Sequence, residues 1–174
     1  MANSLTRICY KCGAGSWLEA KLYQSSILEW EFTYRSISPG SIKDGIGHAA
    51  KISSTAFNDT NKQPSVNRSL ITESPKKVMQ NPDCCVAKIK VSAVRDIKSI
   101  EVTDEALKKL GHSTYGIDVI SRPIGKGESV PENIAHCQIE VSPTVITGSR
   151  FGKIKESLAY IVNESKNRWA LPPT

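Results

Sequence analysis

Residues 28–37 read LEWEFTYRSI and carry the clearest two-residue alternation of the chain. Apolar side chains stand at Leu28, Trp30, Phe32 and Tyr34, and polar ones stand between them. Because successive side chains of a β-strand point to opposite faces, this stretch predicts a strand with one apolar face and one face in solvent.

Further strands are expected towards the C-terminus. Apolar and polar residues alternate over 87–93, a short apolar segment follows at 97–102, and we expect these two strands to pair. Segments 116–121 and 134–141 predict two more strands, so the chain predicts a mostly antiparallel sheet of about five strands.

Two segments carry the signals of helices. Residues 103–111 hold a hydroxyl cap, acids in the first turn, bases in the last and a terminal glycine. From Ser149 onward, six apolar residues fall within about a 100° arc of a helical wheel, and they are Phe151, Ile154, Leu158, Ile161, Val162 and Trp169. We expect a single α+β domain at 28–174, with this C-terminal amphipathic helix packed on one face of the sheet, after an N-terminal segment at 1–27.

Residues 38–83 are rich in turn formers and poor in apolar residues, which predicts one long irregular loop. Phe57 is expected to anchor that loop to the core. Such loops are either insertions or functional loops held by a scaffold, and both interpretations stay open.

The charge balance favours an anionic ligand. The 174 residues include 23 Lys and Arg against 17 Asp and Glu, a net charge of +6 that is shared evenly between the halves. Only 6% of the residues are aromatic, and the strands show no run of exposed aromatics. Nucleic acid is therefore a possible partner through its phosphates only, with no sign that the bases are read.

No apolar run reaches the roughly 18–20 residues of a membrane-spanning helix, and the N-terminus lacks the features of a secretory signal. We expect a cytoplasmic protein with no membrane partner.

Cys9 and Cys12 form a C-x-x-C turn, the strongest short motif of the chain, which can aim two thiolates at one tetrahedral zinc ion. Two further ligands would be needed, and none stands at a recognised spacing. The alternatives are a redox-active pair and two unligated thiols.

The candidate catalytic residues are His136 and Ser54. His136 begins a predicted strand and shares its polar side with Gln138 and Glu140, an arrangement that suits either a catalytic wall or the solvated side of a sheet. His48 lies in the long loop and is a candidate ligand-binding residue.

Two arginines are candidate anion ligands, because a guanidinium can hold a phosphate or carboxylate with two hydrogen bonds. Arg35 ends the first predicted strand, and Arg68 follows a turn of the long loop. Asn58 and Asp59 lie between them and complete the candidate binding set.

Several enzyme signatures are missing. The sequence contains no GxGxxG, GxxxxGK[ST], GxSxG or HExxH motif and no EF-hand loop, so these enzyme classes receive no support.

Four short stretches together resemble a group of small bacterial proteins without an assigned activity. They are Tyr34-Arg35-Ser36-Ile37, Ser54-Thr55-Ala56-Phe57, Pro64-Ser65-Val66-Asn67-Arg68 and Asn133-Ile134-Ala135-His136-Cys137-Gln138-Ile139. Tyr34-Arg35 and Phe57-Asn58 are also similar to the outline of RES-type toxins of the ADP-ribosyltransferase-like group, although the glycine pair of those toxins is absent. That resemblance implies NAD as cofactor, with Arg35 on the dinucleotide and His136 or Ser54 near the reacting ribose.

Three functions follow as hypotheses. The first is a pocket for a phosphate-bearing or otherwise anionic ligand, formed by the long loop with Arg35, Arg68 and His136. The second is an NAD-consuming enzyme. The third is a protein-interaction module of a bacterial toxin–antitoxin or defence system.

Overall fold

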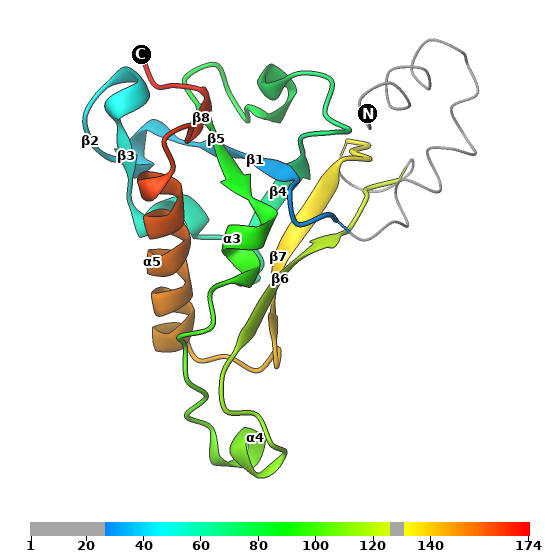
Figure 1. Ribbon diagram of the computed structural model, residues 1–174. Helices are drawn as coiled ribbons and strands as arrows, with labels where there is room; N and C mark the ends of the chain where they lie inside the picture. The colour runs from blue at the N-terminus through cyan, green and yellow to red at the C-terminus, as the bar shows by residue number, and fades with distance from the viewer. Residues whose placement is uncertain (1–26, 126–130) are drawn as a thin grey trace.

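The computed structural model describes residues 27–125 and 131–174 (Figure 1). Within these residues, six strands form one antiparallel sheet in the order β6-β7-β4-β1-β5-β8. The strands are β1 (Phe32–Ile37), β4 (Ser65–Arg68), β5 (Cys85–Lys90), β6 (Gly116–Ser121), β7 (His136–Ser142) and β8 (Trp169–Leu171). A separate pair consists of β2 (Ile42–Asp44) and β3 (Lys51–Ile52).

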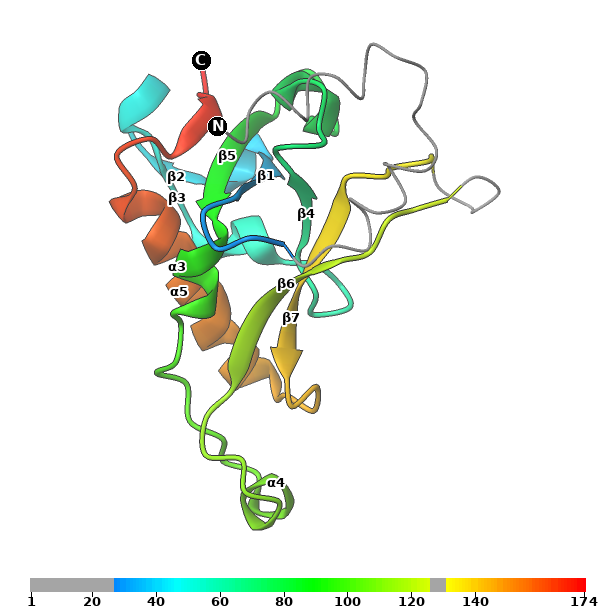
Figure 2. The ribbon, with the colours of Figure 1, turned by 45° about the vertical axis from the view of Figure 1, so that its right-hand side comes forward.

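Helices complete the α+β architecture that the sequence predicts. The α-helices are α3 (Val91–Arg95), α4 (Glu105–Lys109) and α5 (Gly148–Glu164), and the short 3-10 helices are η1 (Pro39–Ser41), η2 (Gly47–Ala49), η3 (Ser54–Phe57) and η4 (Pro75–Val78). In both views α5 stands against the body of the molecule, and α4 projects away from it (Figures 1 and 2). Among the described residues, no helix has the length and apolar character needed to cross a lipid bilayer.

One face of the sheet is buried, and the other is partly exposed, because η4 contacts β1, β5 and β8 and the Gln80 backbone N–H donates to Ser36 Oγ of that face. The inner face is buried beneath α3, α5 and η3, and its side chains are those of Thr33, Ile37, Val66, Ala87, Ile89, Val119, Cys137 and Ile139. The outer face carries the alternate side chains, of which Val86 is fully buried. The other side chains of this face include Phe32, Tyr34, Ser36, Ser65, Asn67, Lys88, Lys90, Asp118, His136, Gln138 and Glu140, and they are partly or fully exposed. Each buried Ile or Val contributes about 1.5–3 kcal/mol, so the inner face holds the sheet together.

The segment 28–37 is a strand only from Phe32, and its polar side is the buried one. Glu31 and Thr33 are 1% and 0% exposed, whereas Trp30 and Phe32 are 52% and 36% exposed. The reason is that Arg68 pairs with Glu31 inside the core and so permits a carboxylate to be buried.

The two strands expected at 87–93 and 97–102 do not pair. The β5 strand ends at Lys90, and Val91 and Ser92 donate backbone hydrogen bonds to the carbonyls of Glu31 and Glu29 as α3 begins. Residues 100–102 bond instead to residues 113–115, on the far side of α4.

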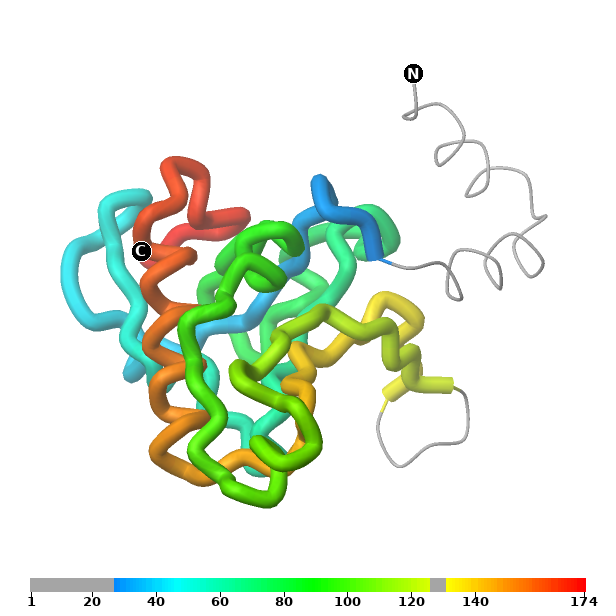
Figure 3. The backbone as a smooth tube through the Cα atoms, turned by 60° about the horizontal axis from the view of Figure 1, so that its bottom comes forward, coloured from blue at the N-terminus to red at the C-terminus, as the bar shows by residue number. Residues whose placement is uncertain are grey.

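Residues 38–83 are not one irregular loop, because β4 lies within them at the middle of the sheet, between β1 and β7. Phe57 is fully buried, which confirms it as a core anchor. The segment that holds β2 and β3 lies alongside α5 (Figure 3).

The helix ends differ slightly from prediction. The cap of α4 is Asp104, whose carboxylate accepts from the backbone N–H groups of Ala106 and Leu107. The α5 helix ends at Glu164, so Trp169 lies in β8, where its Nε1 donates to the carbonyl of Ala50 at 3.2 Å.

Candidate functional site

A continuous row of polar side chains crosses the outer face. Lys88 on β5 is aligned with Tyr34 on β1, Tyr34 with Asn67 on β4, and Asn67 with His136 on β7. Arg122, just after β6, extends the row through a backbone hydrogen bond from its N–H to the His136 carbonyl. We call these five residues the polar row. Since neighbouring strands are about 4.8 Å apart, the row is about 19 Å long.

Hydrogen bonds orient two members of the row. His136 Nδ1 lies 2.7 Å from the carbonyl oxygen of Arg122. A carbonyl oxygen only accepts, so Nδ1 carries the proton and the Nε2 atom of the neutral ring is an acceptor. Asn67 Oδ1 accepts from Asn133 Nδ2 at 2.6 Å, which assigns the amide NH₂ of Asn67 as its remaining hydrogen-bonding group.

The outer face carries cationic charge that no carboxylate neutralises within residues 27–125 and 131–174. Lys88 and Lys90 make no ion pair there. The carboxylates of this face are already occupied, since Glu140 pairs with Arg122 and Asp118 pairs with Arg95. The hydrogen bonds that Arg122 donates to Glu140 raise the pKa of Arg122. Burial raises the pKa of Tyr34, which keeps its phenol protonated and able to donate at neutral pH.

Aromatic side chains adjoin the polar row. Phe32 is two residues before Tyr34 on the same face and is directly opposite Lys90. The Lys88 ammonium lies 5.9 Å from the centre of the Phe32 ring. Trp30, immediately before the strand, is half exposed.

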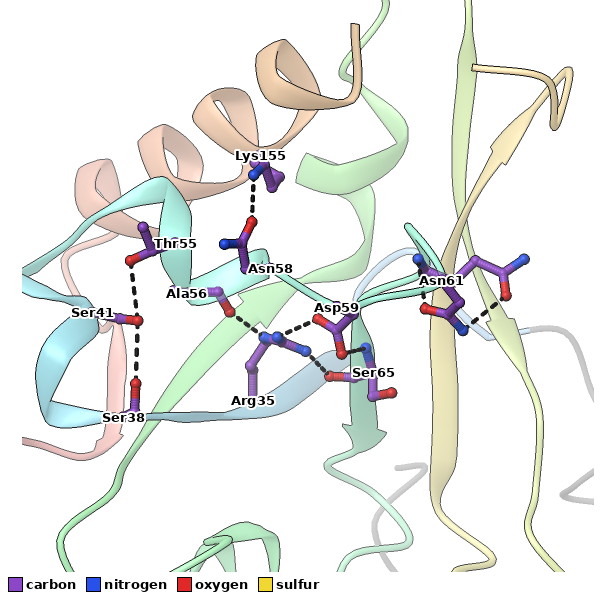
Figure 4. A network of polar contacts seen from close by, with 11 residues as sticks. Arg35, Ser38, Ser41, Thr55, Ala56, Asn58, Asp59, Asn61, Ser65 and Lys155 are labelled. Carbon is purple, nitrogen blue, oxygen red and sulfur yellow. Dashed lines mark hydrogen bonds and ion pairs between the residues drawn. The ribbon is translucent and has the colours of Figure 1, made fainter. Parts of the chain in front are cut away.

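The Arg35 guanidinium holds the loop that follows η3 (Figure 4). Arg35 Nε donates to the carbonyl of Ala56 at 2.7 Å, Nη1 donates to the carbonyl of Ser65, and Nη2 pairs with Asp59. The same group lies 5.3 Å from the centre of the Phe57 ring. Arg35 therefore fastens the loop to the sheet.

Arg68 is buried, with its Nε and Nη2 each 2.9 Å from an oxygen of the Glu31 carboxylate. The Cys137 thiol lies near this pair, and burial raises its pKa to about 12. Arg68 thus lies in the core rather than in an open binding pocket.

The remaining candidates of the long loop lie apart from the polar row. Ser54 begins η3 and lines a hollow of about 680 Å³ against α5. Asn58 accepts a hydrogen bond from Lys155 of α5 (Figure 4). Asp59, whose Oδ2 pairs with Arg35, accepts at its Oδ1 from the Ser65 backbone N–H. His48 is exposed on η2.

Arg35 and His136 lie on opposite faces of the sheet. Arg35 is aligned with the buried Ala87 of the inner face, whereas His136 is aligned with Asn67 of the outer face. The sheet therefore separates the arginine from the histidine that a single pocket would need.

Cys9 and Cys12 lie outside the described residues. Within residues 27–125 and 131–174, no three His, Cys, Asp or Glu side chains are grouped as a metal site would require. Cys84, Cys85 and Cys137 are buried free thiols.

Fold and site together define an α+β protein whose antiparallel sheet presents one partly exposed polar face beside aromatic side chains. No protein-family model, no curated protein and no solved structure matches the chain.

Most of the outer-face site is missed by reasoning from the sequence. His136 is the one predicted site residue that lies in the polar row. The alternation of Lys88 and Lys90 with Ala87 and Ile89 was a usable signal, because it already separates a cationic face from an apolar one.

Proposed function

We propose that the protein binds a phosphate-bearing ligand on the outer face of its sheet. The observation that carries the proposal is the polar row, in which Lys88, Tyr34, Asn67 and His136 stand side by side on four adjacent strands. An ammonium, a phenol and an amide supply the donors that phosphate oxygens accept.

The charge arrangement supports this choice over the pocket expected from the sequence. Arg35 and Arg68 already hold Asp59 and Glu31, so neither guanidinium can turn to a ligand without leaving a carboxylate unpaired. The ammonium groups of Lys88 and Lys90 require no such exchange.

The NAD-consuming alternative receives less support. It needs Arg35, Ser54 and His136 around one dinucleotide, whereas Arg35 and His136 stand on opposite faces of the sheet. The protein-interaction alternative would use the same exposed aromatics, Trp30 and Phe32, and predicts self-association that depends on them.

The test is a titration of the ¹⁵N-labelled protein with inorganic tripolyphosphate, followed by amide chemical shifts. We expect shifts concentrated in β1, β4, β5 and β7, and their loss in the double variant Lys88→Gln with Lys90→Gln. The control, Lys153→Gln with Lys166→Gln, removes the same charge from exposed lysines of α5 and the segment after it. Shifts confined to the neighbourhood of Lys153 and Lys166, or no shifts, would refute the proposal.

A further inference from the structure

We infer that the ligand is a single-stranded nucleic acid, which stacks a base on Phe32 and places its phosphates on Lys88 and Lys90. This inference rests on the proposed function and adds the class of the phosphate-bearing ligand.

Phe32 and Trp30 form an exposed aromatic surface, which we call the aromatic platform. Phe32 is 36% exposed and Trp30 is 52% exposed, at the end of the outer face where β1 begins. Aromatic rings on an open sheet face are the surfaces on which proteins stack unpaired bases, because every base has an aromatic face.

Positive charge surrounds the aromatic platform, because Lys88 and Lys90 lie beside it. Lys90 is aligned with Phe32, and Lys88 lies over the ring of Phe32 while aligned with Tyr34. Two lysines without an ion pair among the described residues thus flank one ring. A base and its adjoining phosphates require this combination, whereas an apolar peptide gains little from two ammonium groups beside the ring.

The length and the hydrogen-bonding groups of the polar row also favour a single-stranded nucleic acid. At about 19 Å it exceeds what a single nucleotide can contact, so an extended strand of several nucleotides suits it better than a mononucleotide. Asn67 offers amide donors, and His136 offers its Nε2 atom, which are groups that read the edges of unpaired bases. A duplex hides its base faces, and this predicts a preference for single strands.

The experiment measures the fluorescence anisotropy of a labelled twelve-residue oligothymidine titrated with the protein, at several salt concentrations. We expect binding that weakens as salt rises, and weaker binding of a duplex of the same length. Lys88→Gln with Lys90→Gln should lower the slope of log K against log salt by about 1.4, since each phosphate contact on a single strand contributes about 0.7.

Phe32→Leu should weaken binding on the order of tenfold and leave the salt slope unchanged, because it removes a ring and no charge. Phe32→Tyr keeps the ring and should retain the affinity. The matched control is Tyr160→Leu, which removes a ring that is 65% exposed on α5, away from the outer face. Far-ultraviolet circular dichroism checks that each variant is folded.

The outcomes distinguish the two proposals. If tripolyphosphate binds at the polar row but the oligonucleotide does not bind, or binds with no dependence on Phe32 or no less tightly as a duplex, this inference is overturned and the proposed function stands. If neither tripolyphosphate nor oligonucleotide binds, both fail. Self-association that disappears in Phe32→Leu, when neither the oligonucleotide nor tripolyphosphate binds, would assign the aromatic platform to protein contact and overturn both.

Discussion

The Arg68 guanidinium grips the Glu31 carboxylate with two hydrogen bonds of 2.9 Å inside the core. Both side chains are almost fully buried, so each charge is stabilised by its partner instead of by water. This ion pair explains why the segment around β1 buries its polar side and exposes its aromatic side.

Removing one partner of this ion pair should be severely destabilising. We expect Arg68→Met to lower the free energy of unfolding by about 3–5 kcal/mol, because the Glu31 charge stays buried without a partner. Urea unfolding measures the change. The double variant Glu31→Leu with Arg68→Met should recover most of the loss, and a double variant as unstable as the single one would contradict this account.

Arg35→Ala should loosen the loop without impairing ligand binding. The substitution removes the hydrogen bonds to Ala56 and Ser65 and the pair with Asp59. Since hydrogen bonds to charged groups contribute about 1.5–3 kcal/mol each and these are partly exposed, we expect a total loss of about 2–3 kcal/mol. Limited proteolysis should cut within residues 58–64 sooner than in the wild type. A loss of tripolyphosphate binding in the folded variant would instead place Arg35 in the binding site.

The buried Cys137 thiol should make the protein less stable at alkaline pH. Its pKa is raised to about 12 by burial, whereas an unfolded cysteine has a pKa of about 8.5. Below about pH 8.5 both states keep the proton and the stability contribution is fully present; above it only the unfolded thiol ionises, so stability falls as pH rises towards 12. Between pH 8.5 and 10 this group costs at most about 2 kcal/mol.

The measurement for Cys137 is urea unfolding at the two pH values, in the wild type and in Cys137→Ala. Other titrating groups act in both proteins and cancel in the comparison. The variant should lose less stability over this interval, and equal losses would show that the thiol ionises without hindrance in the folded protein.

Asn163 joins β3 to α5 and should not tolerate aspartate. Its Oδ1 accepts from the Ile52 backbone N–H at 2.9 Å, and its Nδ2 donates to the Ile52 carbonyl at 2.9 Å. In Asn163→Asp a carboxylate oxygen would face that carbonyl, so we expect a loss of about 1–3 kcal/mol at neutral pH. Amide hydrogen exchange at Ile52 should quicken. Asn163→Gln retains both hydrogen-bonding groups on a longer side chain. Its stability should lie between those of the wild type and of Asn163→Asp.

The architecture was predictable where one strong local pattern dominated. The strand at 116–121, the alternating faces of the strand near His136 and the helix after Ser149 follow from periodicity alone, and the structure confirms them. The α4 helix follows from its capping signals. Each of these elements has its main determinants within its own residues.

Elements whose neighbours decide their structure were not predictable. β4 has four residues among turn formers, and it becomes a central strand because β1 and β7 pair with both of its edges. The inward orientation of Glu31 depends on Arg68, which follows it by 37 residues. The polar row was invisible for the same reason, since its members come from distant parts of the chain and only strand pairing aligns them.

The place of β7 in the sheet has a consequence for how the chain folds. The β7 strand inserts between β4 and β6, and it pairs with a strand that ends at Arg68, far earlier in the sequence. During synthesis, β1, β4 and β5 can assemble first, but β4 keeps an open edge until residue 142 has left the ribosome. Long-range pairing of this kind slows folding, and an open edge can recruit foreign strands. The nascent chain is therefore most exposed to aggregation in the interval between the synthesis of β5 and that of β7.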